Sequence, residues 1–62
     1  MPAIEDRTLD APDNVGAIRY RFHYYDDDGA PVDRELATRY HAEGFDAQGA
    51  SVHREHGIIR RP

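Results

Sequence analysis

Hydrophobic and polar residues alternate strictly along one segment of the chain, from Ile18 to Tyr24. Aliphatic or aromatic side chains occupy the even positions, and arginine or histidine occupies the odd positions. Such alternation, rich in aromatic residues, is typical of a β-strand with one buried face. The tract 26–29, which reads DDDG, then supplies residues that favour tight turns. The pattern predicts a strand that runs into a turn.

A related pattern returns twenty residues later in the chain. The sequence YDDDGAPVDRE, which begins at Tyr25, is echoed by FDAQGASVHRE, which begins at Phe45. The two copies share the Asp and Gly of the turn and the Ala, Val, Arg and Glu that follow. A repeat of about this length is typical of a stacked supersecondary unit. It predicts two β-hairpins that share a central strand.

One pairing register fits both hairpins if each turn is a three-residue loop that ends in a glycine bulge. In this register apolar side chains oppose one another, and acidic side chains oppose basic ones, whereas a one-residue slip would mix the two faces. The turn pairs are Asp26 with Ala30 and Asp46 with Ala50. The other pairs expected in the first hairpin are Tyr24 with Val32, Phe22 with Arg34, Tyr20 with Leu36, His23 with Asp33 and Arg21 with Glu35. Those expected in the second are Gly44 with Val52, Tyr40 with His56, Glu43 with His53 and His41 with Glu55.

These patterns predict a mainly β fold, a three-stranded antiparallel meander with a flexible N-terminal arm. Residues 1–15 form the arm, because they are polar and follow neither a helical nor a strand period. Residues 16–62 form a single small β domain. The alternative is an α+β fold, strand–helix–hairpin, with a helix at residues 33–43. Asp33 would cap that helix and Gly44 would end it.

One face of the predicted sheet is apolar and aromatic, with arginine beside the rings. A single sheet cannot bury such a face against itself, so the face requires a second layer. The arm is too short and too polar to supply that layer, so we expect a second copy of the chain or a larger protein to cover it. Aromatic residues and arginine are also enriched at protein interfaces. The expected partner-binding residues are Tyr20, Phe22, Tyr24, Arg34, Leu36 and Tyr40.

Composition narrows the classes of function. The 62 residues form at most one domain, and the absence of cysteine excludes disulfides and thiol catalysis. Twelve acidic residues against eight arginines, with no lysine, give a net charge of −4, which disfavours a general binder of the phosphate backbone. There is neither an apolar run long enough to cross a membrane nor a signal peptide, so the expected location is cytoplasmic.

No catalytic site, metal or cofactor is predicted. Neither Ser51 nor any threonine stands in a nucleophile motif, and a sheet this small encloses no substrate pocket. The DDDG tract lacks the first ligand of a calcium loop. Four residues that gather on one face of the predicted sheet could hold zinc, but they also form neutralising cross-strand pairs. They are His41, Glu43, His53 and Glu55.

The resulting hypothesis is a small, non-catalytic interaction or accessory protein. Its apolar aromatic face would serve for self-association, as a homodimer, or for docking onto a larger protein. An alternative is binding of single-stranded nucleic acid, in which bases stack on the rings beside arginines: Arg19, Arg21, Arg39 and the terminal Arg60 and Arg61. A lesser alternative is the metal site of histidine and glutamate just named.

Overall fold

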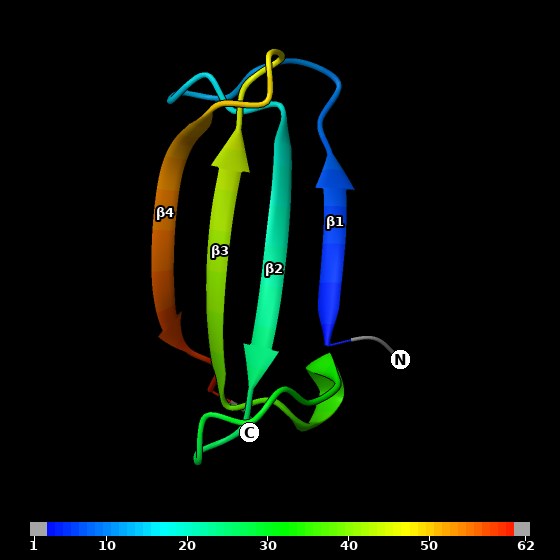
Figure 1. The fold of residues 1–62 in the computed structure, drawn as a ribbon, viewed down its shortest axis with the longest axis vertical. Helices are drawn as coiled ribbons and strands as arrows, with labels where there is room; N and C mark the ends of the chain where they lie inside the picture. Colours follow the sequence, from blue (N-terminus) through cyan, green and yellow to red (C-terminus); the bar gives the residue numbers. More distant parts are fainter. Residues whose placement is uncertain (1–2, 61–62) are drawn as a thin grey trace.

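The computed structural model describes residues 3–60, which form one open, four-stranded antiparallel sheet (Figure 1). The strands lie in the sheet in the order in which they occur in the chain. They are β1 (Ile4–Thr8), β2 (Arg19–Tyr25), β3 (Arg39–Phe45) and β4 (Ser51–Ile58). A short 3-10 helix, η1 (Arg34–Leu36), lies between β2 and β3. The mainly β prediction is confirmed, with four strands in place of three. Within residues 3–60, no helix is long and apolar enough to span a membrane.

The additional strand, β1, lies within residues 1–15, the segment predicted to be a flexible arm. Its five residues all pair with β2, from Ile4 opposite His23 to Thr8 opposite Arg19. The sequence IEDRT places charged residues on both faces, so it lacks the alternation that marks a half-buried strand. Backbone pairing with β2 therefore orders a strand that polarity alone does not reveal.

The first predicted hairpin forms only next to its turn. The Asp26 N–H donates to the Ala30 carbonyl at 3.0 Å, and the Val32 N–H donates to the Tyr24 carbonyl at 3.2 Å, as the predicted register requires. Tyr25 and Pro31 form a bridge between these two bonds, and the chain leaves the sheet only after Val32, where Asp33 precedes η1. The strand that continues along β2 is β3, which follows β2 after a connection of thirteen residues.

The other pairs predicted for the first hairpin are therefore wrong. The observed pairs are Tyr20 with Gly44, Arg21 with Glu43, Phe22 with Ala42 and His23 with His41. The predicted partners Leu36, Glu35, Arg34 and Asp33 lie in η1 or directly before it. The alternative helix at residues 33–43 is also wrong, since only residues 34–36 form a helical turn and β3 begins at Arg39.

The second hairpin, β3–β4, is correctly predicted as a hairpin, but its register shifts after the turn. The Asp46 N–H donates to the Ala50 carbonyl at 2.9 Å, as predicted. Phe45 then faces Ser51 while Gly44 faces His53, so β4 contains one extra residue, a β-bulge. Each later pair predicted for this hairpin is wrong by one position. The observed pairs are Gly44 with His53, Glu43 with Arg54, His41 with His56 and Tyr40 with Gly57.

Three turns share one sequence pattern, Asp-x-x-Gly-Ala, and one hydrogen-bond pattern. DNVGA, DDDGA and DAQGA begin at Asp13, Asp26 and Asp46. In each turn the Asp N–H donates to the Ala carbonyl, the Gly N–H donates to the Asp carbonyl, and Asp Oδ1 accepts two further backbone N–H groups. The glycine has a φ of 85° or 86°, a conformation that favours glycine. The turn at Asp13 is a third copy, absent from the twenty-residue repeat because no aromatic strand precedes it.

The two faces of the sheet differ in chemistry. We call face A the face with the even-numbered residues of β2 and β3, residues 5 and 7 of β1, and residues 53, 55 and 57 of β4. Face B is the opposite one, where Asp6, Arg21, Glu43 and Arg54 form a cross-strand row of alternating charge. The buried hydrophobic residues are Ala17, Tyr24, Ala37 and Ala42. The core is thus thin, and the strands contribute to it on face A.

Candidate interaction surface on face A

Four of the six predicted partner-binding residues, Tyr20, Phe22, Tyr24 and Tyr40, lie together on face A, and we call them the aromatic strip. The rings of Tyr20 and Phe22 have centroids 6.2 Å apart with planes at 26°. Those of Phe22 and Tyr24 are 6.4 Å apart at 14°. Tyr24 faces Tyr40 on β3. Offset stacking of this kind is a favourable arrangement for aromatic rings, so the strip is one continuous surface.

The other two predicted residues, Arg34 and Leu36, belong to η1 and not to a strand. Arg34 nevertheless reaches face A, because its Nη1 lies 3.3 Å from the carboxylate of Glu5 on β1. Leu36 is 71% exposed. The structure therefore connects Arg34 to the strip through Glu5, and it leaves Leu36 as an exposed apolar side chain on η1.

Small residues lie under the rings on the neighbouring strand. A Cβ atom on Gly44 would lie 2.9 Å from Cε1 of Tyr20, its cross-strand partner. The same contact recurs one strand further, where a Cβ atom on Gly57 would lie 2.8 Å from Cε1 of Tyr40. Glycine in a strand often marks such close approach. The rings of Tyr20 and Tyr40 thus each cover a glycine, a relation that only the cross-strand register reveals.

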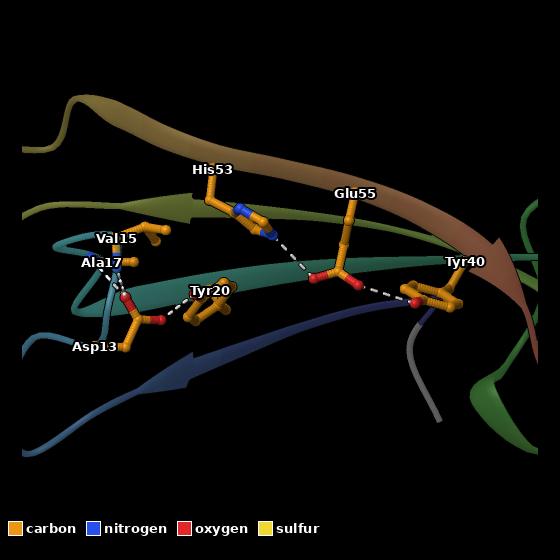
Figure 2. Close-up of polar contacts among 7 residues, drawn as sticks. All are labelled: Asp13, Val15, Ala17, Tyr20, Tyr40, His53 and Glu55. Carbon is orange, nitrogen blue, oxygen red and sulfur yellow. Dashed lines mark hydrogen bonds and ion pairs between the residues drawn. The ribbon is translucent and has the colours of Figure 1, made fainter.

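Each tyrosine hydroxyl of the strip donates a hydrogen bond to a carboxylate. The acceptors come from three elements: β1, β4 and the connection before β2 (Figure 2 shows two of the three). The pairs are Tyr20 with Asp13, Tyr24 with Glu5 (Oη to Oε1, 3.1 Å) and Tyr40 with Glu55 (Oη to Oε2, 3.0 Å). Sequence reasoning missed these carboxylates, because it assigned acidic residues to turns, to the arm and to pairs with basic side chains. The rings are therefore held at their polar ends by three anions.

These bonds affect the ionisation of the tyrosines. The bond to Asp13 raises the pKa of Tyr20, and the bond to Glu55 raises the pKa of Tyr40. Burial, followed by the bond to its carboxylate partner, raises the pKa of Tyr24. A hydrogen bond to the neutral form disfavours ionisation of a phenol beside an anion. The strip therefore stays neutral and keeps its three O–H donors.

His53 extends this network along β4. Its Nε2 lies 3.0 Å from Oε1 of Glu55, whose other oxygen accepts the bond from Tyr40 (Figure 2). The bond to His53, followed by the bond to Tyr40, lowers the pKa of Glu55. The His53 ring also meets the Tyr20 ring edge-on, with centroids 6.3 Å apart at 73°. The network thus joins β4 to β2 and β3 across face A.

The four residues considered as a metal site do not meet. The bulge in β4 brings His53 and Glu55 to face A, whereas His41 and Glu43 lie on face B. In the part of the chain that the structure describes, no group of three or more histidine, aspartate or glutamate residues is arranged to hold a metal ion.

Three of the arginines considered for nucleic-acid binding lie on the face opposite the rings. Arg19, Arg21 and Arg39 are odd-numbered residues of β2 and β3, which places them on face B. Arg60 follows β4, and Arg61 lies outside the described residues. Face A carries Arg7, whose Cζ lies 5.9 Å from the Phe22 ring centroid, but carboxylates line the rings. Phosphate binding requires a positive field. The structure thus separates the two components of the nucleic-acid hypothesis.

No family model matches the chain, and no curated protein or solved structure is significantly similar to it. The geometry and chemistry of face A are therefore the basis for assigning a role.

Proposed function

We propose that the protein is a small, non-catalytic interaction protein that uses the aromatic strip of face A to bind another protein chain. The favoured partner is a second copy, and the alternative is a larger protein. The observation that carries the proposal is the single layer: within residues 3–60, no further sheet and no helix beyond the three residues of η1 accompany the four strands. Domains normally bury such a face between two layers. The proposal places the protein in the cytoplasm, which the cysteine-free composition permits.

The thin core supports this role. Three of the four buried hydrophobic residues are alanines, and no large side chain is fully buried in the described part of the chain. Phe22, in the middle of the strip, is only half-buried. Full burial of a ring of this kind contributes about 1.5–3 kcal/mol. A partner that covers the strip would therefore add stability that the isolated sheet lacks, as is common for very small domains.

The tyrosine–carboxylate pairs also suit an interface. Tyrosine and arginine are the residue types that most often dominate binding energy. Rings that are already fixed by hydrogen bonds lose less rotamer entropy when a partner binds. The three bonded tyrosines, with Arg34 held by Glu5 beside them, therefore form a preorganised surface.

The test compares two adjacent residues that point to opposite faces. Phe22→Asp places a carboxylate in the middle of the strip and should abolish assembly or folding. Arg21→Gln on face B removes an ion pair between two exposed side chains, Arg21 and Asp6, and should be nearly silent. Light scattering measures the mass of each variant, and circular dichroism measures its fold. A folded Phe22→Asp protein with the wild-type mass would contradict self-association through this face, as would equal losses in both variants.

A further inference from the structure

Both edges of the sheet are open. β1 and β4 lie at opposite ends of the strand order, and each pairs with one other strand within residues 3–60 (Figure 1). An open edge presents backbone N–H and C=O groups that can pair with a strand of another chain. The edge residues whose side chains point to face B are all exposed: Ile4, Asp6 and Thr8 on β1, and Arg54, His56 and Ile58 on β4.

The backbone hydrogen bonds at the ends of β1 define which of its groups point outward. The Leu9 N–H donates to the Ile18 carbonyl at 2.7 Å, and the Tyr24 N–H donates to the Ala3 carbonyl at 2.9 Å. Odd-numbered residues of this segment therefore direct their backbone groups toward β2. Hydrogen-bonded and non-hydrogen-bonded pairs alternate along an antiparallel ladder. The outward-directed residues of β1 are thus Ile4, Asp6 and Thr8.

The same reasoning applies to β4. The Ile59 N–H donates to the Thr38 carbonyl at 2.8 Å, so odd-numbered residues at this end of β4 direct their backbone groups toward β3. By alternation, Arg54, His56 and Ile58 direct theirs outward. β1 and β4 also run in opposite directions, since each strand is antiparallel to the next. A second copy placed beside β4 in the same orientation would therefore offer its β1 as an antiparallel neighbour.

One register joins the two edges over the whole length of β1. Outward-directed residues meet when Thr8 lies opposite Arg54, Asp6 opposite His56 and Ile4 opposite Ile58. All six side chains point to face B, so the two faces continue from one copy to the next. On face A the same register sets Arg7 opposite Glu55. It thus pairs acid with base on both faces and isoleucine with isoleucine at the end.

Other registers and pairings are less complementary. Sliding the strands by two residues in one direction opposes Glu5 to Glu55 and Arg7 to His53. Sliding them in the other direction opposes Asp6 to Ile58 and separates Arg7 from Glu55. Full-length antiparallel pairing of β1 with β1 of a second copy opposes Asp6 to Asp6. Pairing of β4 with β4 of a second copy about the centre of the strand opposes two Arg54, two Glu55 or two His56 side chains. Like charges directly opposite destabilise a sheet.

We propose that the protein assembles edge to edge, with β1 of one copy paired to β4 of another in the register that sets Asp6 opposite His56. The inference rests on the proposed function, because the second copy is the partner assigned there. Because β1 and β4 are different edges, the contact is head-to-tail and can repeat from copy to copy. The aromatic strips of joined copies then lie side by side on one continuous face A.

Engineered cysteines test the register directly, since the chain contains no cysteine of its own. The pair Thr8→Cys with Arg54→Cys should form a disulfide between copies under mild oxidation, seen as a covalent dimer on a non-reducing gel. Within one copy the two positions lie three strand spacings apart, about 14 Å. That is well beyond the roughly 7 Å between Cα atoms that a disulfide can bridge. The matched control, Thr8→Cys with His56→Cys, keeps the same strands and the same face but is two residues out of register, and it should cross-link several-fold more slowly.

The outcomes separate this inference from the proposed function. A dimeric wild-type protein whose two cysteine pairs cross-link equally, or not at all, overturns the edge register and leaves the strip as the contact surface. A wild-type monomer that yields no covalent dimer overturns both the edge register and self-association. A charge exchange provides a readout without cysteine. His56→Asp should lower the dimer fraction by setting Asp opposite Asp6, and exchanging the pair by adding Asp6→His should restore it. Both residues lie on face B, outside the hydrogen-bond network of the strip, so failure of that rescue would also overturn the register.

Discussion

A methyl group at Gly44 should destabilise the fold through one identified contact. The Cβ atom would lie 2.9 Å from Cε1 of Tyr20 and 3.0 Å from Cβ of Ala17. Neither neighbour is free to withdraw, because Tyr20 is held by its bond to Asp13 and Ala17 is fully buried. Gly44 does not have a positive φ, so the substitution introduces no backbone strain of that kind. Gly44→Ala therefore tests packing without strain from a left-handed backbone conformation.

The expected magnitude follows from two opposing terms. Overpacking by one methylene-sized group costs about 1–3 kcal/mol. Replacing glycine by alanine at a compatible backbone position returns about 0.4–1 kcal/mol by restricting the unfolded chain. The net loss for Gly44→Ala is thus about 1–2 kcal/mol. In a domain of this size, each kcal/mol lowers the melting temperature by roughly 4–8 °C, so the expected fall is about 4–16 °C.

The assay is thermal unfolding followed by circular dichroism. All variants are compared at one protein concentration, because assembly makes the melting temperature depend on concentration. The control is the same substitution in a Tyr20→Ala background, where the ring is gone and the cost of Gly44→Ala should shrink. An equal loss in both backgrounds would refute the contact with Tyr20. A Gly44→Ala protein as stable as wild type would refute the close packing of face A altogether.

Two further predictions concern the carboxylates of face A. Asp13→Ala should lower the melting temperature more than Asp46→Ala. Each aspartate accepts the same backbone hydrogen bonds in its own turn, but only Asp13 also accepts a bond from the Tyr20 hydroxyl. Equal losses in thermal melts would argue against the tyrosine bond. The pKa values of Asp13 and Glu55 are lowered in the folded state. Their stabilisation is therefore present above the unfolded values near 4 and is lost as pH falls through the folded ones. The raised pKa values of Tyr20 and Tyr40 give a second loss as pH rises above about 10. Urea midpoints measured across pH should show both limbs, and Glu55→Gln should shrink the acid limb; an unchanged acid limb would contradict the assignment.

Part of the fold was predictable because polarity alternates where one face of a strand is packed. This is true of β2, and the Asp and Gly of the repeated turns supply a second local signal. β1 gives neither signal, since its charged residues lie on both faces. The first hairpin register was wrong beyond Val32, because the chain there forms η1 and does not continue along β2, although both copies share the same turn.

The aromatic strip was predictable to a different extent. Even positions on one strand share a face whatever that strand pairs with, so Tyr20, Phe22 and Tyr24 were correctly placed together. The partners of those residues depend on register to within a single residue. The bulge in β4 alone moves Glu55 from the predicted face to the face that carries Tyr40. Hydrogen-bond partners across strands therefore required the structure, whereas membership of the strip did not.

The strand order also bears on the route by which the chain folds. Every strand pairs only with its neighbours in the sequence, across connections of ten, thirteen and five residues. Closing the thirteen-residue connection costs about 0.8 kcal/mol more entropy than closing the five-residue one. The β3–β4 hairpin is therefore the cheapest to close, the β1–β2 hairpin with its ten-residue connection comes next, and the β2–β3 pairing is the costliest. Such local pairing shortens the conformational search of an all-β chain. The strand order also leaves β1, an edge strand with charges on both faces, as the first to detach, which amide hydrogen exchange would report strand by strand.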